Sequence, residues 1–236
     1  MNGSRNADKA LEQIKAVTFD VGGTLIEPWP SVGHVYAEVA ARHGLREFSA
    51  EQLNTRFKTS WRARKNFEHS RHEWAELVNE VFGISHAEPF SETFFSELYE
   101  RFATPDAWRV FEDVVPALDT LAARGIRLGI ISNWDERLRG LLRKLKLERY
   151  FVALTVSREV GFPKPSGVIF RQAAAELGLS PGAILHVGDS LEMDVAGAKT
   201  AGFQALQIHR GADSVDGQLR SLAELSAKIG NPLPIN

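Results

Sequence analysis

The chain contains no cysteine among its 236 residues. Thiol nucleophiles, thiolate zinc sites and disulfides are therefore excluded together. The lack of cysteine also fits the reducing cytosol, so we expect a cytoplasmic protein. Residues 1–15 are predominantly polar and lack an apolar core, so we expect no signal peptide there.

Positive and negative charges are nearly balanced. Lys and Arg number 28 against 30 Asp and Glu, which gives a formal net charge of -2. Without a basic excess or a polybasic run, we expect neither a nucleic acid nor an anionic membrane as partner. No apolar stretch approaches the ~20 residues that cross a bilayer. Glycine-rich dinucleotide and P-loop strings are absent too, which disfavours those nucleotide-binding classes.

What the chain does contain falls into three zones. The first is a short apolar, partly β-branched run from Ala16 to Phe19 that ends at Asp20. Gly22 and Gly23 follow at once. This pattern predicts a buried strand that ends in a tight turn.

The second zone, residues 30–103, has the pattern of successive helices. Apolar residues recur at helix spacing, and prolines at 28, 30 and 105 mark plausible boundaries. Most of the aromatic side chains of this zone are expected in the core of a helical bundle. Helices are predicted near residues 32–43, 50–67, 73–82 and 91–102.

The third zone alternates apolar strand patterns with helical ones up to the C-terminus. Such an alternation implies right-handed crossovers and a mostly parallel sheet, covered by helices on both faces. The predicted fold is therefore α/β, a doubly wound Rossmann-like sheet formed by residues 1–29 and 104–236, with a helical domain (30–103) inserted after the first strand. The strands are predicted at 126–132, 153–157, 183–187 and 203–208, and the helices at 113–124, 136–147, 166–177 and 193–201.

Polar residues follow four of these predicted segments. In a parallel sheet, ligands bind beyond the carboxyl ends of the strands, so residues that follow several strands converge at one edge. Any one of them alone is more often a turn former than a site residue. Together they predict a site that holds acids, a hydroxyl group and a lysine. The residues concerned are Asp20, Ser132, Asn133, Lys164, Gly188, Asp189 and Asp194.

These segments resemble the four signature motifs of the haloacid dehalogenase superfamily, in the same order. The segments read VTFDVGGTL (17–25), IISN (130–133), KP (164–165) and GDSLEMDVAGAKTAG (188–202). The strings SNWDERL and FPKP to HVGD are most similar to the Dreg-type branch. The resemblance implies a Mg²⁺-dependent hydrolase whose inserted helical domain is a cap that sets selectivity for a small phosphorylated metabolite.

In such an enzyme Asp20 would be the nucleophile, and water would then hydrolyse the aspartyl-phosphate formed on it. Asp20 and Asp189 are hard oxygen ligands suited to Mg²⁺, and the backbone carbonyl of Gly22 can be a third. Asp194 is expected to support the site without binding the metal. Lys164 would also favour the ionised form of Asp20.

Substrate phosphate would be bound from two sides. Ser132 and Lys164 are expected to contact its non-bridging oxygens. The backbone N–H groups of Val21 to Thr24 can form a nest that accepts phosphate oxygens. The predicted substrate-binding residues are therefore Gly23, Thr24, Ser132, Asn133 and Lys164. His186, inside a predicted strand, is expected to be a satisfied core histidine.

One position departs from the family pattern. Phosphatases of the superfamily usually carry D-x-D-x-T, and their second aspartate protonates the leaving group. Here the string is DVGGT, so Gly22 stands at that position. General acid–base help of this kind contributes ~10²–10⁴ in rate.

Four explanations are open. The substrates could have good leaving groups, as acyl phosphates do, or Glu27 or a cap residue could supply the proton. The bond cleaved could be carbon–halogen or carbon–phosphorus. Asp189 looks like a metal ligand, which carbon–halogen cleavage does not need. Carbon–phosphorus cleavage would need a cap lysine that forms a Schiff base with the substrate, but a helical lysine such as Lys58 or Lys65 is usually a surface charge. The chain could also be an impaired enzyme that binds phospholigands or partners. We rank hydrolysis of a phosphate ester or acyl phosphate first, binding of a phospholigand or partner second, and the other bond cleavages last. We expect the chain to be a monomer or a homodimer.

Overall fold

The computed structural model describes residues 13–64, 67–84, 91–211, 215 and 217–230. The chain divides into two compact units. Met1–Ile26 together with Val110–Asn236 form one of them, called the α/β unit below. Glu27–Arg109 form the other, called the helical unit. In the part of the chain that the structure describes, no helix is long and apolar enough to cross a membrane.

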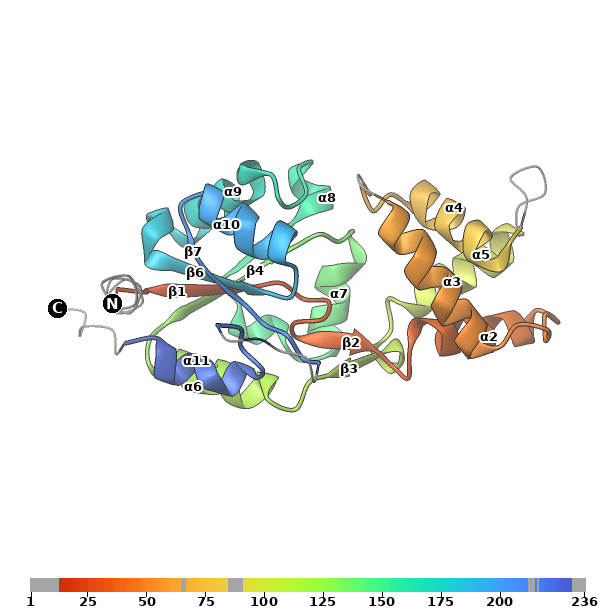
Figure 1. Cartoon of the computed structure of the whole chain (residues 1–236), viewed down its shortest axis with the longest axis horizontal. Coiled ribbons are helices and arrows are strands. Elements are labelled where there is room, and N and C mark those ends of the chain that lie inside the picture. Colours follow the sequence, from red (N-terminus) through yellow and green to blue (C-terminus); the bar gives the residue numbers. More distant parts are fainter. Residues whose placement is uncertain (1–12, 65–66, 85–90, 212–214, 216, 231–236) are drawn as a thin grey trace. The chain divides into compact units, whose positions relative to one another are not determined.

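A five-stranded parallel sheet forms the centre of the α/β unit, with the strand order β5-β4-β1-β6-β7 (Figure 1). The chain runs outward from β1 through β4 to β5, and then returns to the other side of β1 to form β6 and β7. This order confirms the doubly wound fold and places the switch point at β1. The strands are β1 Ala16–Phe19, β4 Arg127–Ser132, β5 Ala153–Val156, β6 Ile184–Gly188 and β7 Gln204–Gln207.

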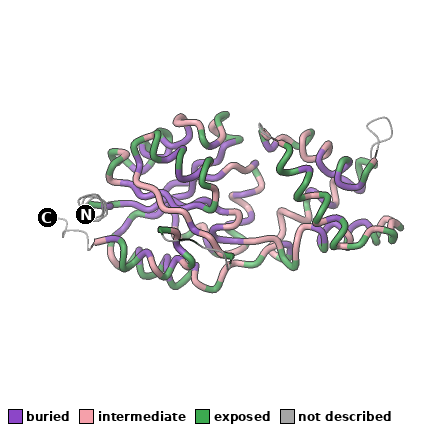
Figure 2. The backbone as a smooth tube through the Cα atoms, in the orientation of Figure 1, coloured by how far each residue is buried: buried purple, intermediate pink, exposed green. Residues whose placement is uncertain are grey.

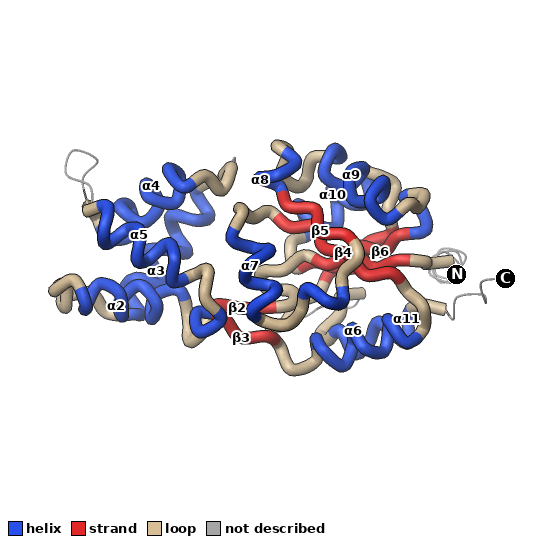
Figure 3. Tube along the Cα trace, turned by 180° about the vertical axis from the view of Figure 1, so that it is seen from behind, coloured by secondary structure: helices blue, strands red, loops and turns tan. Residues whose placement is uncertain are grey.

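Helices cover both faces of the sheet. Helices α9 and α10 lie on one face, and α6 and α11 lie on the other (Figures 1 and 3). The strands β1, β5 and β6 are accordingly buried along their whole length (Figure 2). The helices are α6 Val114–Ala123, α7 Arg137–Lys144, α8 Ser157–Val160, α9 Gly167–Leu177, α10 Gly197–Thr200 and α11 Leu225–Lys228, with a π-helical turn at Leu191–Ala196 before α10.

Helix α9 is held to the sheet by an apolar stripe. Ile169, Phe170, Ala173 and Leu177 are buried and recur at helix spacing. They pack in one cluster with residues of the sheet such as Ile131. This packing fixes the loop that leads into α9, which carries Lys164.

The helical unit contains four α-helices in its described part, each preceded by a serine whose side chain caps it. A serine oxygen at this position accepts one of the first, otherwise unpaired N–H groups of the helix. Tyr36 and Phe82 stack at 5.8 Å in the core, whereas Trp61 is 38% exposed. The helices are α2 Val32–Arg42, α3 Ala50–Ala63, α4 Arg71–Phe82 and α5 Glu92–Arg101.

A two-stranded ribbon that the sequence analysis did not predict carries the chain into and out of the helical unit. It pairs β2 (Ile26–Pro28) with β3 (Trp108–Val110). Glu27, one of the suggested alternative proton donors, accepts hydrogen bonds from the guanidinium of Arg109. This guanidinium also lies 3.7 Å from the ring centre of Trp29.

Candidate active site

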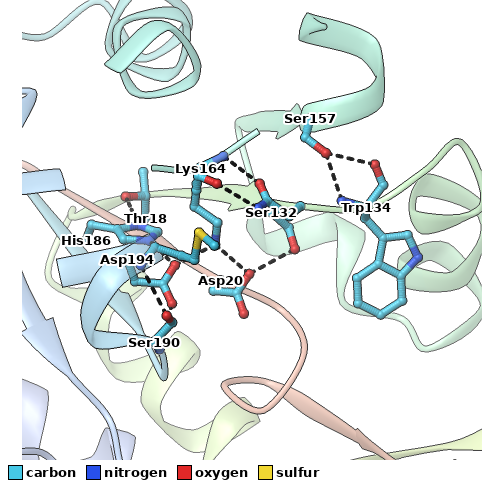
Figure 4. Close-up of polar contacts among 11 residues, drawn as sticks. Thr18, Asp20, Ser132, Trp134, Ser157, Lys164, His186, Ser190 and Asp194 are labelled. Atoms are coloured by element: carbon cyan, nitrogen blue, oxygen red, sulfur yellow. Dashed lines mark hydrogen bonds and ion pairs between the residues drawn. The ribbon is translucent and has the colours of Figure 1, made fainter. Parts of the chain in front are cut away.

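Asp20 follows β1 directly, at the switch point of the sheet. Its backbone N–H donates to the carbonyl of Val187 at 2.9 Å, which continues the pairing with β6. Its carboxylate oxygen Oδ1 accepts hydrogen bonds from Ser132 Oγ at 2.9 Å and from Lys164 Nζ at 2.7 Å (Figure 4). Three segments far apart in the sequence therefore meet at one carboxylate that is only 8% exposed.

Lys164 links two carboxylates. Its ammonium donates to Oδ1 of Asp20 and, at 2.5 Å, to Oδ1 of Asp194. Burial alone would lower the pKa of Lys164, but the charges of Asp194 and Asp20 outweigh burial and raise this pKa above its usual value. The lysine therefore stays charged at any physiological pH.

The side-chain amide of Asn133 holds the backbone of Lys164. Its Nδ2 donates to the carbonyl of Lys164 at 3.0 Å, and its Oδ1 accepts from the N–H of Lys164 at 2.7 Å. Both polar ends of the amide therefore position the lysine, which the sequence analysis did not foresee. Direct contact between Asn133 and a substrate stays a prediction.

Three carboxylates lie close together at this edge of the sheet. Each of Asp20, Asp189 and Asp194 offers an oxygen atom, and these atoms lie within 4.8 Å of one another. Lys164 contacts Asp20 and Asp194, and its single positive charge does not balance the three carboxylates. Hard oxygen atoms with surplus negative charge fit a divalent cation such as Mg²⁺.

The pKa values reflect this crowding. Loss of water around Asp189, together with the charges of Asp20 and Asp194, raises the pKa of Asp189 to about 7. Burial raises the pKa of Asp20 as well, although Lys164 opposes it. Burial alone would also raise the pKa of Asp194, but Lys164 and a hydrogen bond from His186 lower it. A bound cation would relieve the repulsion felt by Asp20 and Asp189.

Both oxygens of Asp194 are already engaged. Oδ1 accepts from Lys164 and lies 3.1 Å from Nε2 of His186, and Oδ2 accepts from the N–H of Ser190 at 2.9 Å. Asp194 lies in a π-helical turn, in which the N–H groups of both Asp194 and Val195 donate to the carbonyl of Ser190. Such turns often occur at functional sites.

His186 is buried and satisfied, as expected, but its partner is a carboxylate of the site. Burial lowers the pKa of His186, so its ring is neutral. Its Nδ1 lies 3.0 Å from Oγ1 of Thr18. Since Nε2 faces the carboxylate of Asp194, the proton belongs on Nε2, and the Thr18 hydroxyl donates to Nδ1. The signal in the sequence was a pair of polar residues in two apolar strands, and these two face each other in register.

The turn after Asp20 requires glycine at one position in particular. Gly23 has a φ of +74°, and a Cβ there would lie 2.5 Å from Oδ2 of Asp189. The N–H of Gly23 donates to the carbonyl of Ile26, and the N–H of Thr24 donates to that of Val21. Two of the N–H groups predicted to form the phosphate nest therefore make hydrogen bonds within the turn. Fewer N–H groups are left to bind phosphate than the sequence predicted. Substrate contact by Gly23 and Thr24 stays a prediction.

Arg210 supports this turn from a distant part of the chain. Its guanidinium donates to the carbonyl of Thr24 through Nε at 3.0 Å and Nη2 at 2.6 Å. It also pairs with Asp113 at 3.0 Å and lies 3.8 Å from the ring centre of Phe111. No motif in the sequence indicated this contact, which spans 186 positions.

Known proteins are similar in sequence to the chain over most of its length. The sequence model of the haloacid dehalogenase-like hydrolases matches residues 14–202. The chain is 32% identical over 222 residues to haloacid dehalogenase-like hydrolase domain-containing protein 3 of Mus musculus, covering 88% of this chain and 86% of that protein. It is 30% identical over 222 residues to the rhythmically expressed gene 2 protein of Drosophila melanogaster, covering 85% of each. The last match confirms the similarity to the Dreg-type branch.

Proteins named as phosphatases are also similar to the chain. Glyceraldehyde 3-phosphate phosphatase of Methanopyrus kandleri is 30% identical over 217 residues, covering 84% of this chain and 85% of that protein. The crystal structure of an HAD phosphatase from Thermococcus onnurineus superimposes with a TM-score of 0.67 at 29% identity, covering 93% and 99% of the two chains. By motif order, fold and sequence, the chain belongs to the haloacid dehalogenase-like hydrolase family.

Proposed function

We propose that the chain is a Mg²⁺-dependent phosphatase that acts on a small phosphate ester or acyl phosphate through an aspartyl-phosphate on Asp20. The observation that carries the proposal is the carboxylate of Asp20 at the switch point, bound by Ser132 and Lys164. Family membership and relatives named as phosphatases support it. In this proposal the helical unit serves as the cap that selects the substrate.

Mg²⁺ would be held by the carboxylates of Asp20 and Asp189 and by the backbone carbonyl of Gly22. When bound, the ion supplies positive charge that offsets the charge of the phosphoryl group. Asp194 would support the site, since Lys164, His186 and Ser190 already occupy its oxygens.

The side chains divide the chemistry between them. Ser132 and Lys164 hold Oδ1 of Asp20 in place, and one oxygen of this carboxylate attacks phosphorus. The bond between phosphorus and the leaving oxygen breaks, and the phosphoryl group is then carried by Asp20. Water attacks this aspartyl-phosphate, which releases inorganic phosphate and regenerates the carboxylate. Ser132 and Lys164 would donate to the phosphoryl oxygens in both steps.

The main alternative, a catalytically impaired binding module, is supported by Gly22. A glycine has no proton to give to the leaving oxygen, and that help is typically worth ~10²–10⁴ in rate. An impaired enzyme could then act as a module that binds a phospholigand or a partner. The two functions predict opposite results in a turnover experiment.

The first experiment measures phosphate release from a broad panel of phosphate esters and acyl phosphates, with Mg²⁺ and with EDTA. We expect Mg²⁺-dependent turnover that Asp20→Asn abolishes. Asp119→Asn is the matched control, because Asp119 lies on the surface and accepts from Tyr150. No turnover by the wild-type chain on any substrate would overturn the phosphatase proposal and favour the binding module.

Gly22→Asp provides a second test. If the chain lacks only the acid–base group, this variant should gain turnover of ordinary alkyl phosphates by about 10²-fold or more. The gain should disappear in the double variant that also carries Asp20→Asn. A Gly22→Asp variant that folds, binds Mg²⁺ and still releases no phosphate would contradict the assigned nucleophile.

A further inference from the structure

Trp134 lies two residues beyond Ser132, where the chain leaves β4. Its backbone is fixed from both sides: its N–H donates to Ser157 Oγ at 3.1 Å, and its carbonyl accepts from that hydroxyl and from the N–H of Arg158, both at 3.2 Å (Figure 4). The backbone that bears the indole ring is therefore held in place by the fold of the α/β unit.

The ring borders the space above Gly22. A Cβ built on Gly22 would lie 3.5 Å from Cζ3 of Trp134, which is an ordinary van der Waals contact. The next residue of the same turn, Gly23, lies against the carboxylate of Asp189. The turn therefore has the carboxylate cluster on one side and an aromatic hydrocarbon surface on the other.

The described side chains of the α/β unit that cluster with Asp20 offer no proton to a leaving group on this side. Asp189 is a proposed metal ligand, and both oxygens of Asp194 accept hydrogen bonds. Lys164 is already committed to two carboxylates. With no proton from these residues, a leaving oxygen next to Gly22 departs as an anion. An oxygen bonded to carbon departs more readily as an anion when it is conjugated with a π system, as in phenolates, enolates and carboxylates, and such groups are planar.

We propose that Trp134 is a specificity-determining residue which, together with Gly22, selects phosphates whose leaving oxygen is bonded to a planar, conjugated carbon. Aryl, enol and acyl phosphates belong to this class, and alkyl phosphates do not. The inference rests on the proposed phosphatase function. The planar group would stack on the indole ring, a contact that is favourable for aromatic pairs.

The proposed step balances without a proton donor. An oxygen of the Asp20 carboxylate forms the new bond to phosphorus, and the bond from phosphorus to the leaving oxygen breaks with its electron pair on that oxygen. The conjugated anion leaves and takes up a proton from water according to its own basicity. In the second step water supplies the oxygen of inorganic phosphate, and its released proton passes to the solvent.

The experiment compares substituted phenyl phosphates of graded basicity, benzoyl and acetyl phosphate, and glycerol 3-phosphate, in the wild-type chain with Mg²⁺. We expect kcat/KM to fall steeply as the leaving group becomes more basic, and to be at least about 10²-fold lower for the alkyl ester. Trp134→Leu should lower kcat/KM about 3- to 10-fold for phenyl and benzoyl phosphates. It should change the value for acetyl phosphate less than about twofold, because an acetyl group is too small to stack.

Trp134→Phe keeps an aromatic ring and should retain most of the activity on phenyl phosphates. Tyr150→Leu, which removes an aromatic ring elsewhere on the α/β unit, should change no ratio between substrates. An equal loss on all substrates in Trp134→Leu, with the melting temperature unchanged, would overturn the role of Trp134. Fast hydrolysis of glycerol 3-phosphate by the wild type would overturn the proposed substrate class but would agree with the proposed phosphatase function. Absence of phosphate release from every substrate would overturn the proposed function itself.

Discussion

The ammonium nitrogen of Lys164 lies 2.7 Å from Oδ1 of Asp20, in a pair that solvent barely reaches. The same ammonium lies 2.5 Å from Asp194. One buried cation thus neutralises part of the charge of the carboxylate cluster, and the stability of the site depends on it. When one partner of such a group is removed, the charge left behind is costly.

Lys164→Met should therefore lower the free energy of unfolding by about 3 kcal/mol at neutral pH without Mg²⁺. Urea denaturation followed by circular dichroism measures the change. Lys199→Met, on an exposed lysine of α10, is the control and should stay within about 0.5 kcal/mol of the wild type. Equal, small effects of the two substitutions would show that the pair contributes little.

Gly23→Ala should damage the proposed Mg²⁺ site more than it damages the fold. Gly23 and Gly125 have nearly the same positive φ, +74° and +73°. Alanine at either position should cost about 1–2 kcal/mol. At Gly23 the new Cβ would also displace Oδ2 of Asp189, whereas nothing lies within 4 Å of one at Gly125.

Calorimetric titration with Mg²⁺ separates these two costs. We expect at least about tenfold weaker binding in Gly23→Ala and unchanged binding in Gly125→Ala, since displacing one ligand loses a Mg²⁺–oxygen contact. The same affinity in both variants would argue against Asp189 as a ligand.

His186 should be neutral, with its proton on Nε2, at pH 7 and above. Side-chain ¹⁵N chemical shifts report this tautomer directly, and Thr18→Val should allow the other tautomer to appear. Because burial lowers the pKa of His186, the unfolded chain binds a proton there more readily than the folded chain. This residue should therefore reduce stability as the pH falls through about 6.5. A proton on Nδ1 in the wild-type chain would contradict the contact with Asp194.

Mg²⁺ should stabilise the fold more at high pH than at low pH. The folded chain keeps a proton on Asp189 up to its pKa of about 7, whereas the carboxyl in the unfolded chain loses it near 3.8. Between these values the folded chain binds more protons, so Asp189 lowers stability as the pH rises. Mg²⁺ would offset this loss but must compete with the proton in acid.

Melting temperatures with and without Mg²⁺, at matched ionic strength, test this at pH 5.5 and pH 8. We expect a clearly larger increase at pH 8, and its near absence in Asp189→Asn. An increase of the same size at both pH values would mean that the ion binds elsewhere.

The strands and most of the helices of the α/β unit could be predicted because apolar strand patterns alternate regularly with helical patterns along the chain. The polar residues that end the strands then indicated the site, since parallel strands bring their carboxyl ends to one edge. Asp20, Ser132 and Lys164 could be grouped on that basis. The ribbon β2–β3 could not be predicted, because strands of three residues are too short to show a periodic pattern.

Contacts that depend on the three-dimensional arrangement of the loops could not be predicted from the sequence either. The π-helical turn that brings Asp194 back to Lys164 depends on a change of hydrogen-bond spacing, not of composition. The amide of Asn133 could equally have faced a substrate or the backbone of Lys164. The proximity of Trp134 to Gly22 becomes apparent only when the loops after β1 and β4 are placed side by side.

Direct detection of the intermediate tests the central claim. The wild-type chain would be mixed with Mg²⁺ and acetyl phosphate, quenched in acid during turnover, digested and analysed by mass spectrometry. With no side chain at Gly22 to activate water, the aspartyl-phosphate should persist long enough to be trapped, and one phosphoryl group should map to Asp20. The peptide from Asp20→Asn should carry none. Turnover without a phosphoryl group on Asp20, or phosphate release by Asp20→Asn at the wild-type rate, would contradict the account.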